Sequence, residues 1–149
     1  MEIKTNHFSA LTTTQLYDIL RLRSEVFVVE QNCVYLDLDG LDEDAYHIYI
    51  SVENKIVATA RILKKGVAYK EIAIGRVASS EKYRNLKLGH ALMETAMQFI
   101  SENMDNESVR LSAQSHLKDY YARYGFVPTG NDYLEDGIPH SEMLFEVKN

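Results

Sequence analysis

The chain has 149 residues, of which 46% are hydrophobic and 26% are charged, a composition that favours one globular domain over residues 1–149 with its own core. The formal net charge of −6 argues against a nucleic-acid partner, and the single cysteine excludes an intrachain disulfide and fits a reducing compartment. No apolar run is long enough to span a membrane and the polar N-terminus does not resemble a signal peptide, so we expect a cytoplasmic protein without a membrane partner.

The first part of the chain predicts a strand and a long helix. Residues 2–8 form the predicted strand, and the threonines at 12–14 offer N-caps for a helix over residues 13–31. The apolar stripe of this helix includes Arg23 and Glu30, two charged residues on the face that should be buried. Either they pair with other charges or reach water at the rim, or this face borders a cleft. Desolvation in a cleft would raise the pKa of a carboxylate and suit it to act as a general base.

An acidic segment follows over residues 33–45. Its aspartates do not have the spacing of a calcium-binding loop, so we predict no metal site. We interpret the segment as a solvated acidic loop that could help recruit a cationic amine. Residues 46–52 and 56–64 then predict two strands joined as a hairpin.

The most informative stretch lies between residues 72 and 100, where a strand, a basic loop and an apolar-striped helix follow one another. Lys82, Arg84 and Lys87 place positive charge at the start of the helix, and no ordinary N-cap residue stands there. The first turn of a helix has unpartnered backbone N–H groups and a partial positive charge, so this start suits a phosphate. Gly89 would let a ligand approach the backbone closely, or it only allows the helix to pack on the sheet.

The last part of the chain predicts a strand over 109–114, a helix from residue 115 or 116 to Gly125, a strand over 126–129 and a final strand over 141–147 after a turn at Asp136-Gly137. No linker or internal repeat interrupts this order. Strands that first pair as hairpins and then alternate with helices predict an α+β fold. We expect a mixed, mainly antiparallel central sheet flanked by helices.

Several groups of residues together resemble the GNAT superfamily of N-acetyltransferases, and more specifically its ElaA-like subgroup. Arg84-x-x-Lys87-x-Gly89, between a strand and a helix, is similar to the pyrophosphate-binding motif of that family, with Lys87 where the family has glycine. The other matching pieces, in an order and spacing that are specific together, are Arg23 to Gln31, Gly75-Arg76-Val77, Ala113-Gln114, Tyr121-x-x-x-Gly125-Phe126 and Glu135 to His140.

The resemblance implies a GNAT fold that binds acetyl-CoA as a co-substrate in a cleft where the fourth and fifth strands splay. It implies that the backbones of Val77 and Ser79 pair with the pantetheine arm, that Gln114 meets this arm, and that Tyr121 is the general acid. An ordinary tyrosine keeps its proton at pH 7 and can donate it, although by pattern alone Tyr121 could be a core aromatic. The pyrophosphate would lie on the helix start formed by Arg84, Asn85, Leu86, Lys87, Leu88, Gly89 and His90.

Three residues are candidates for the general base, namely Glu30, Glu71 and His140. Arg76 lies on a strand that should be buried, so it must find a partner. It either forms a structural ion pair or contacts an anionic group of the acyl acceptor. With Arg23 and Glu30 it makes up the predicted acceptor site.

We therefore predict an acetyl-CoA-dependent N-acetyltransferase that moves the acetyl group directly to a primary amine of a small molecule or a protein. The sequence shows no activated nucleophile that would form a covalent intermediate. Two alternatives stay open: an acyl-CoA-binding sensor without turnover, and an acyltransferase that resembles the acyl-homoserine-lactone synthases. Members of the family are often dimers, so a homodimer is one option.

Overall fold

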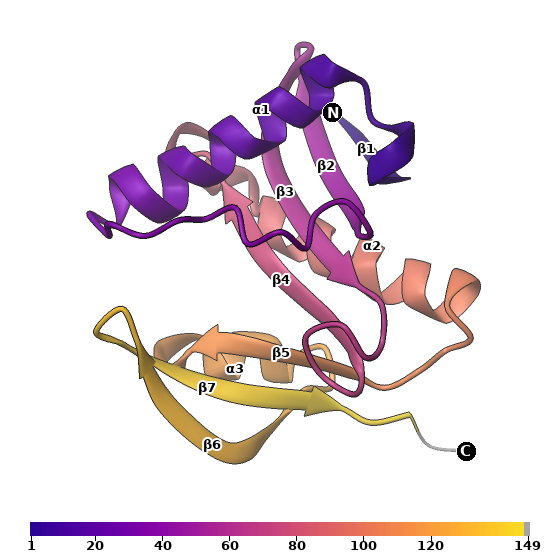
Figure 1. The fold of residues 1–149 in the computed structure, drawn as a ribbon, viewed down its shortest axis with the longest axis vertical. Coiled ribbons are helices and arrows are strands. Elements are labelled where there is room, and N and C mark those ends of the chain that lie inside the picture. Colours follow the sequence, from indigo (N-terminus) through magenta and orange to yellow (C-terminus); the bar gives the residue numbers. More distant parts are fainter. Residues whose placement is uncertain (148–149) are drawn as a thin grey trace.

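The computed structural model describes residues 1–147, which form one mixed sheet with helices on both of its faces (Figure 1). The strands are β1 (Glu2–His7), β2 (Tyr46–Val52), β3 (Lys55–Leu63), β4 (Ile72–Ser79), β5 (Val109–Gln114), β6 (Val127–Glu135) and β7 (Ile138–Phe145). The α-helices are α1 (Thr13–Arg23), α2 (Leu88–Asn103) and the short α3 (Lys118–Ala122). Shorter 3₁₀ or π segments are η1 (Phe8–Ala10), η2 (Ser24–Glu30), η3 (Glu81–Leu86) and η4 (Ser115–Leu117).

The sheet has the strand order β1-β2-β3-β4-β5-β7-β6. Within residues 1–147, β4 and β5 are the one parallel pair, and all other neighbouring strands are antiparallel. This arrangement confirms the α+β fold with a mixed, mainly antiparallel sheet. In Figure 1, α1 lies in front of the sheet and α2 lies behind it, so a helix covers each face.

Two apolar layers hold the sheet between its helices. On the α2 side, Leu92 packs in one cluster with Ile48 and Ile50 of β2, and all three side chains are fully buried. On the α1 side, Ile19 packs in a second cluster with Tyr49. Tyr49 stands between the two isoleucines of β2, so the alternation of side chains along the strand separates the two layers.

The first helix begins as predicted but ends differently. The hydroxyl of Thr12 accepts a hydrogen bond from the Gln15 backbone N–H at 3.1 Å, and the Gln15 side chain accepts one from the Thr12 N–H at 2.9 Å, which is a capping box. The sequence predicts one helix to residue 31, whereas α1 ends at Arg23 and the chain continues as the π-helix η2 to Glu30. The wider turns of a π-helix shift the side chains, so Val26 is buried there although the α-helical stripe does not include it.

The last hairpin is longer than the sequence predicts. Instead of strands over 126–129 and 141–147, β6 and β7 extend to a common turn at Asp136-Gly137, which the sequence does predict. Gly130, with a φ of 93°, lies where the register between the two strands shifts. A glycine of this kind marks a β-bulge within a strand as readily as the end of one, so the strand continues past it.

A buried network of arginines and aspartates fastens the segment after η2 to the sheet. Arg23 is 1% exposed, and it donates hydrogen bonds through Nε to Asp37 at 2.8 Å and through Nη1 to Asp42 at 2.7 Å. Arg61 of β3 donates to Asp42 at 3.0 Å and to Asp39 at 2.8 Å. Burial raises the pKa of Asp39, but hydrogen bonds and the charge of Arg61 outweigh it and lower this pKa to about 2, so the carboxyl stays ionised.

This network corrects two sequence-based expectations. The acidic segment is not solvated throughout: Asp37 and Asp42 are only 3% and 8% exposed and are paired with arginines, so these two carboxylates are not available to recruit a cationic amine, whereas Asp39, Glu43 and Asp44 are exposed. Arg23 is not part of the acceptor site, because both carboxylates bind its guanidinium inside the protein. Its role is structural: it holds residues 33–42, which we call the strap, against the sheet.

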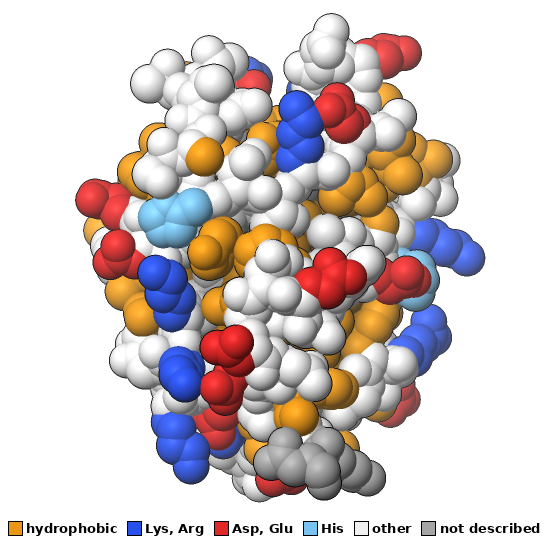
Figure 2. Space-filling view, turned by 90° about the vertical axis from the view of Figure 1, so that its right-hand side faces the viewer, with side chains coloured by type: hydrophobic (Ala, Val, Ile, Leu, Met, Phe, Trp, Pro, Cys, Tyr) orange, Lys and Arg blue, Asp and Glu red, His pale blue; other side chains and the backbone are white. Residues whose placement is uncertain are grey.

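The helices and one face of the surface bear on the expected membrane and charge properties. Among the helices of residues 1–147, none is both long and apolar enough to cross a membrane. The face in Figure 2 carries Lys and Arg side chains interspersed with Asp and Glu, with hydrophobic side chains between them. No broad patch of a single sign covers that face.

We expect Arg23→Met to destabilise the fold strongly, because it leaves Asp37 and Asp42 buried without their partner. Breaking a buried ion pair costs about 3–5 kcal/mol, so the free energy of unfolding from urea denaturation should fall by that amount. Arg21→Met on the same helix is the matched control, since Arg21 forms an exposed pair with Glu25 that contributes about 0.3–0.5 kcal/mol. Equal losses in the two variants would contradict the structural role of Arg23.

Candidate active site

A β-bulge interrupts β4 in the middle of the sheet. The register between β3 and β4 shifts between Thr59 and Arg61, and β4 has one extra residue there. Arg76 in this bulge has a φ of 49°, a left-handed conformation that is strained for a residue with a Cβ. Its Nε lies 2.9 Å from the Asp37 carboxylate and its Nη2 donates to the Asp37 carbonyl at 3.0 Å. The strap therefore holds the bulge in place.

Next to the bulge, β4 and β5 separate. They pair only at Ile72 with Val109 and at Ala73 with Arg110. Farther along, β5 pairs with β7 on its other side, and β4 diverges from it toward the left of Figure 1. Among residues 1–147, the side of β4 that faces β5 therefore has no strand partner from Ile74 onward for its backbone N–H and C=O groups. A cavity of about 700 Å³ opens between the two strands.

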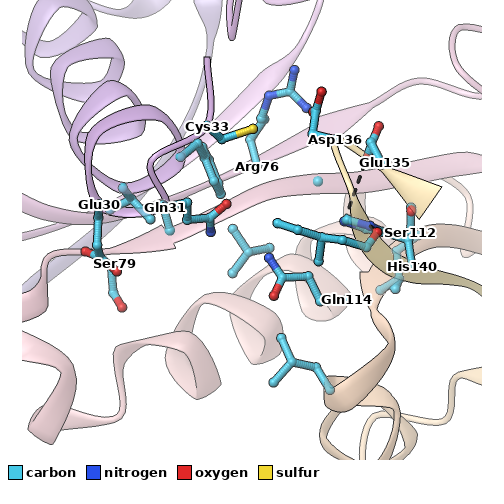
Figure 3. Close-up of a pocket in the computed structure, with 18 of the residues that line it drawn as sticks. Glu30, Gln31, Cys33, Arg76, Ser79, Ser112, Gln114, Glu135, Asp136 and His140 are labelled. Carbon is cyan, nitrogen blue, oxygen red and sulfur yellow. Dashed lines mark hydrogen bonds and ion pairs between the residues drawn. The ribbon is translucent and has the colours of Figure 1, made fainter. Parts of the chain in front are cut away.

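Residues from distant parts of the chain line this cavity (Figure 3). Its walls are η2 with the strap, β4, β5 with η4 and α3, and the β6–β7 turn. The predicted site residues among them are Glu30, Arg76, Val77, Ser79, Arg84, Gln114, Tyr121 and His140. The structure adds residues that the sequence analysis did not place in the site: Cys33, Tyr35, Ser112, His116, Tyr120, Glu135 and Asp136. Strand alternation could have identified Ser112, which points to the same face of β5 as Gln114.

The helix α2 begins beside the cavity without a side-chain cap. Lys87 is its N-cap residue, and no side chain there accepts a hydrogen bond from the first turn. Lys87 has a φ of 55° and a ψ of 43°, a conformation that glycine adopts without strain, and glycine is the residue that the related motif has at this position. Unpartnered N–H groups together with the Arg84 guanidinium are the features of an anion-binding corner.

Most of the predicted helix-start residues lie outside the lining of the cavity. They are Asn85, Leu86, Lys87, Leu88, Gly89 and His90. Leu88 is 1% exposed, so its side chain belongs to the core. The His90 ring is engaged by its neighbours, with Nδ1 at 2.6 Å from the Tyr124 hydroxyl and Nε2 in contact with Glu94.

Gly89 leaves room for a tyrosine of α3. A Cβ at Gly89 would lie 3.0 Å from the hydroxyl of Tyr120, closer than an unstrained contact allows. The missing side chain therefore serves the packing of α2 against α3, and not the packing of the helix on the sheet that the sequence offers as one interpretation. Close approach of a ligand to the backbone of Gly89 stays a prediction.

His140 is oriented by a backbone carbonyl. Its Nδ1 lies 2.8 Å from the Ile138 carbonyl oxygen, which only accepts hydrogen bonds, so Nδ1 carries the proton. In the neutral ring the lone pair is then on Nε2, which lies 3.4 Å from a carboxylate oxygen of Glu135 (Figure 3). The Tyr133 ring stacks on the imidazole with 5.9 Å between centroids. A ring held in this tautomer can accept a proton on Nε2.

The two glutamates predicted as alternative bases are both engaged by arginines. Glu30 lines the cavity, but its carboxylate is 2.7 Å from Nη2 of Arg84. Glu71 does not line the cavity. It is bound by Arg110 at 2.9 Å through both oxygens, and these hydrogen bonds lower the pKa of Glu71. Among the three candidates for the general base, the geometry therefore favours His140.

Tyr121 is a buried phenol in the cavity wall. It is 8% exposed, and burial together with the neighbouring Tyr120 raises its pKa to about 12. The two rings are in edge contact with 5.1 Å between their centroids. Tyr121 therefore keeps its proton throughout the neutral and moderately alkaline range, which is what a proton donor needs.

Comparison with known proteins agrees with this fold and site. The family model of the acetyltransferase (GNAT) domain matches residues 15–147, so the chain belongs to the GNAT acetyltransferase family. This family and fold are those of acyl-CoA-dependent N-acyltransferases. Within the family, the chain is 44% identical over 143 residues to the protein ElaA of Escherichia coli, which covers 95% of this chain and 94% of that protein.

Solved structures give the same result. An acyl-CoA N-acyltransferase from Pseudomonas aeruginosa is 43% identical and superposes with a TM-score of 0.92, covering 96% of this chain and 97% of that one. Escherichia coli ElaA is 42% identical over 97% of this chain and 99% of that one, with a TM-score of 0.91. The acyl-homoserine-lactone synthase LasI, at 14% identity, 97% and 89% coverage and a TM-score of 0.78, shares the fold alone.

A double-mutant cycle tests the contact between Gly89 and Tyr120. Gly89→Ala gains helix propensity in any background, but in the parent its Cβ would meet the Tyr120 hydroxyl at 3.0 Å. We expect Gly89→Ala to be more favourable by about 1 kcal/mol in the Tyr120→Phe background than in the parent, measured as the free energy of unfolding. An identical effect in both backgrounds would mean that Tyr120 does not require a glycine at this position.

Proposed function

We propose that the protein transfers an acetyl group from acetyl-CoA to a primary amine in one direct step. The observation that carries this proposal is a cavity at the divergence of β4 from β5, lined by Arg84, with the uncapped start of α2 beside it. A diphosphate fits the bare N–H groups of the helix, with Arg84 and the exposed Lys82 and Lys87 beside them. The amides of a pantetheine arm fit the unpaired edge of β4 at Val77 and Ser79.

Two side chains in the cavity would handle the protons of this reaction. Acetyl-CoA supplies a thioester, whose C–S bond breaks as the C–N bond to the amine forms. His140 would accept through Nε2 the proton that the attacking amine loses, and later pass it to solvent. Tyr121 would donate its proton to the departing sulfur and regain one from solvent. Unpaired N–H groups of β4 are suited to stabilise the oxyanion that develops between these steps.

The acceptor would enter from the side of the strap and the β6–β7 turn, where His140 lies. Arg76 lines this end with 26% of its side chain exposed, while Asp37 neutralises its charge. The proposed acceptor is a primary amine of a small molecule or a protein. The high identity to an acyl-CoA N-acyltransferase supports turnover over the sensor alternative, and the low identity to LasI gives the lactone-synthase alternative no comparable support.

Calorimetric titration with acetyl-CoA tests the nucleotide site. We expect clear binding by the wild-type chain and an affinity lower by about tenfold or more in Arg84→Gln, because a charge-assisted contact to the diphosphate is lost. Arg21→Gln is the matched control, since it removes the same charge from an exposed residue outside the cavity. Release of free thiol is then measured with a panel of primary amines that includes a polyamine, an aromatic amine and a lysine peptide. Binding without thiol release from any amine would leave the sensor as the function.

Substitution of the two proton-handling residues tests the chemical step. Tyr121→Phe should lower kcat by about 100-fold while leaving the affinity for acetyl-CoA unchanged, and Tyr120→Phe should have little effect. Since the pKa of Tyr121 is about 12, its ionisation should not lower the rate below pH 10. His140→Gln should lower the rate most at neutral pH and less near pH 10, where a larger fraction of the amine is already deprotonated. A larger loss in Tyr120→Phe than in Tyr121→Phe would reassign the acid.

A further inference from the structure

One ion pair spans the cavity between η2 and the segment that precedes α2. The Glu30 carboxylate is 2.7 Å from Nη2 of Arg84, and the same Nη2 donates to the carbonyl oxygen of Ser79 at 3.1 Å. Glu30 and Arg84 both line the cavity, and Figure 3 shows Glu30 and Ser79 next to each other at one end of it. The guanidinium that is placed to hold a diphosphate is thus already bound to a carboxylate of the protein.

This pair differs from the other arginine–carboxylate pairs near the site. Arg23 and Arg61 are nearly fully buried, and each binds two aspartates, so their partners are fixed. The side chains of Glu30 and Arg84 keep 31% and 41% of their surface exposed. An exposed pair is weak, because water screens it, whereas a guanidinium binds phosphate through strong charge-assisted hydrogen bonds. A diphosphate can therefore replace Glu30 on Arg84.

We propose that Glu30 is an internal counter-ion that Arg84 exchanges for the diphosphate of acyl-CoA. This inference rests on the function proposed above and adds to it a competition between Glu30 and the diphosphate for Arg84. A diphosphate and a carboxylate on the same guanidinium repel each other, so binding of acyl-CoA releases Glu30. Glu30 therefore opposes the binding of acyl-CoA, and its carboxylate is free of Arg84 only in the bound state.

Calorimetric titration with acetyl-CoA measures the opposing effect. Glu30→Gln should bind acetyl-CoA about threefold to tenfold more tightly than the wild-type chain, because the competitor for Arg84 is gone. Glu25→Gln is the matched control: it removes the same charge from η2, but Glu25 pairs with Arg21 outside the cavity. Its affinity should equal that of the wild type. An equal gain in both variants would reduce the effect to net charge and overturn the proposal.

The Arg84→Gln background shows whether the effect passes through Arg84. There, Glu30→Gln should no longer change the affinity by the same factor, since no guanidinium is left to compete for. Thermal unfolding of each variant confirms that it is folded.

The outcomes separate this inference from the function on which it rests. If the wild-type chain does not bind acetyl-CoA, the proposed function itself fails. If it binds, but Glu30→Gln has the same affinity or a lower one, the exchange is wrong and the acetyltransferase proposal stands.

Discussion

The separation of β4 from β5 is the constraint on which the site depends. A parallel pair of strands would otherwise bond along its length and leave no space between them. The bulge in β4, with Arg76 in a left-handed conformation, turns the strand away after two paired residues on each side. This strained backbone persists because Asp37 binds the Arg76 side chain, and Arg23 in turn holds Asp37. A chain of ionic contacts from α1 through the strap to the bulge thus keeps the cavity open.

Arginine–carboxylate contacts serve two purposes in this molecule, and burial distinguishes them. Arg23 and Arg61 are buried and both bind Asp42. Removing one member of this network therefore leaves a buried charge without an opposite charge beside it. The pair between Glu30 and Arg84 remains in contact with water, so breaking it costs little free energy because water solvates both charges. The first kind of contact fixes the walls of the cavity, and the second is suited to respond to a ligand.

Local features of the fold could be predicted because neighbouring residues determine them. The capping box at Thr12, the turn at Asp136-Gly137 and the uncapped start of α2 all follow from residues within one turn of each other. The π-helix after Arg23 and the bulge at Gly130 could not be predicted in this way. Both are changes of register that depend on what the segment packs against, which short-range patterns do not contain.

Some residues of the site could be predicted from their side-chain chemistry and their position in an expected element. Charged residues that pair with residues far away in the sequence could not. His140 and Tyr121 lie in the cavity as candidates from the sequence, but only the structure shows which nitrogen of His140 is free. Arg23 has the charge and helix position of a ligand-binding residue, and its aspartate partners are separated from it by 14 and 19 positions. No periodicity in the sequence connects a residue to partners at such distances.

The Tyr120 hydroxyl that occupies the space above Gly89 has a consequence for the evolution of the family. Two positions that share one small volume cannot change independently during evolution. A larger residue at one position requires a smaller or displaced side chain at the other. Homologues that carry alanine or serine at the position of Gly89 should therefore carry phenylalanine or a smaller residue at that of Tyr120. A correlation of this kind in an alignment would reflect the steric fit of two helices, whether or not either residue meets a substrate.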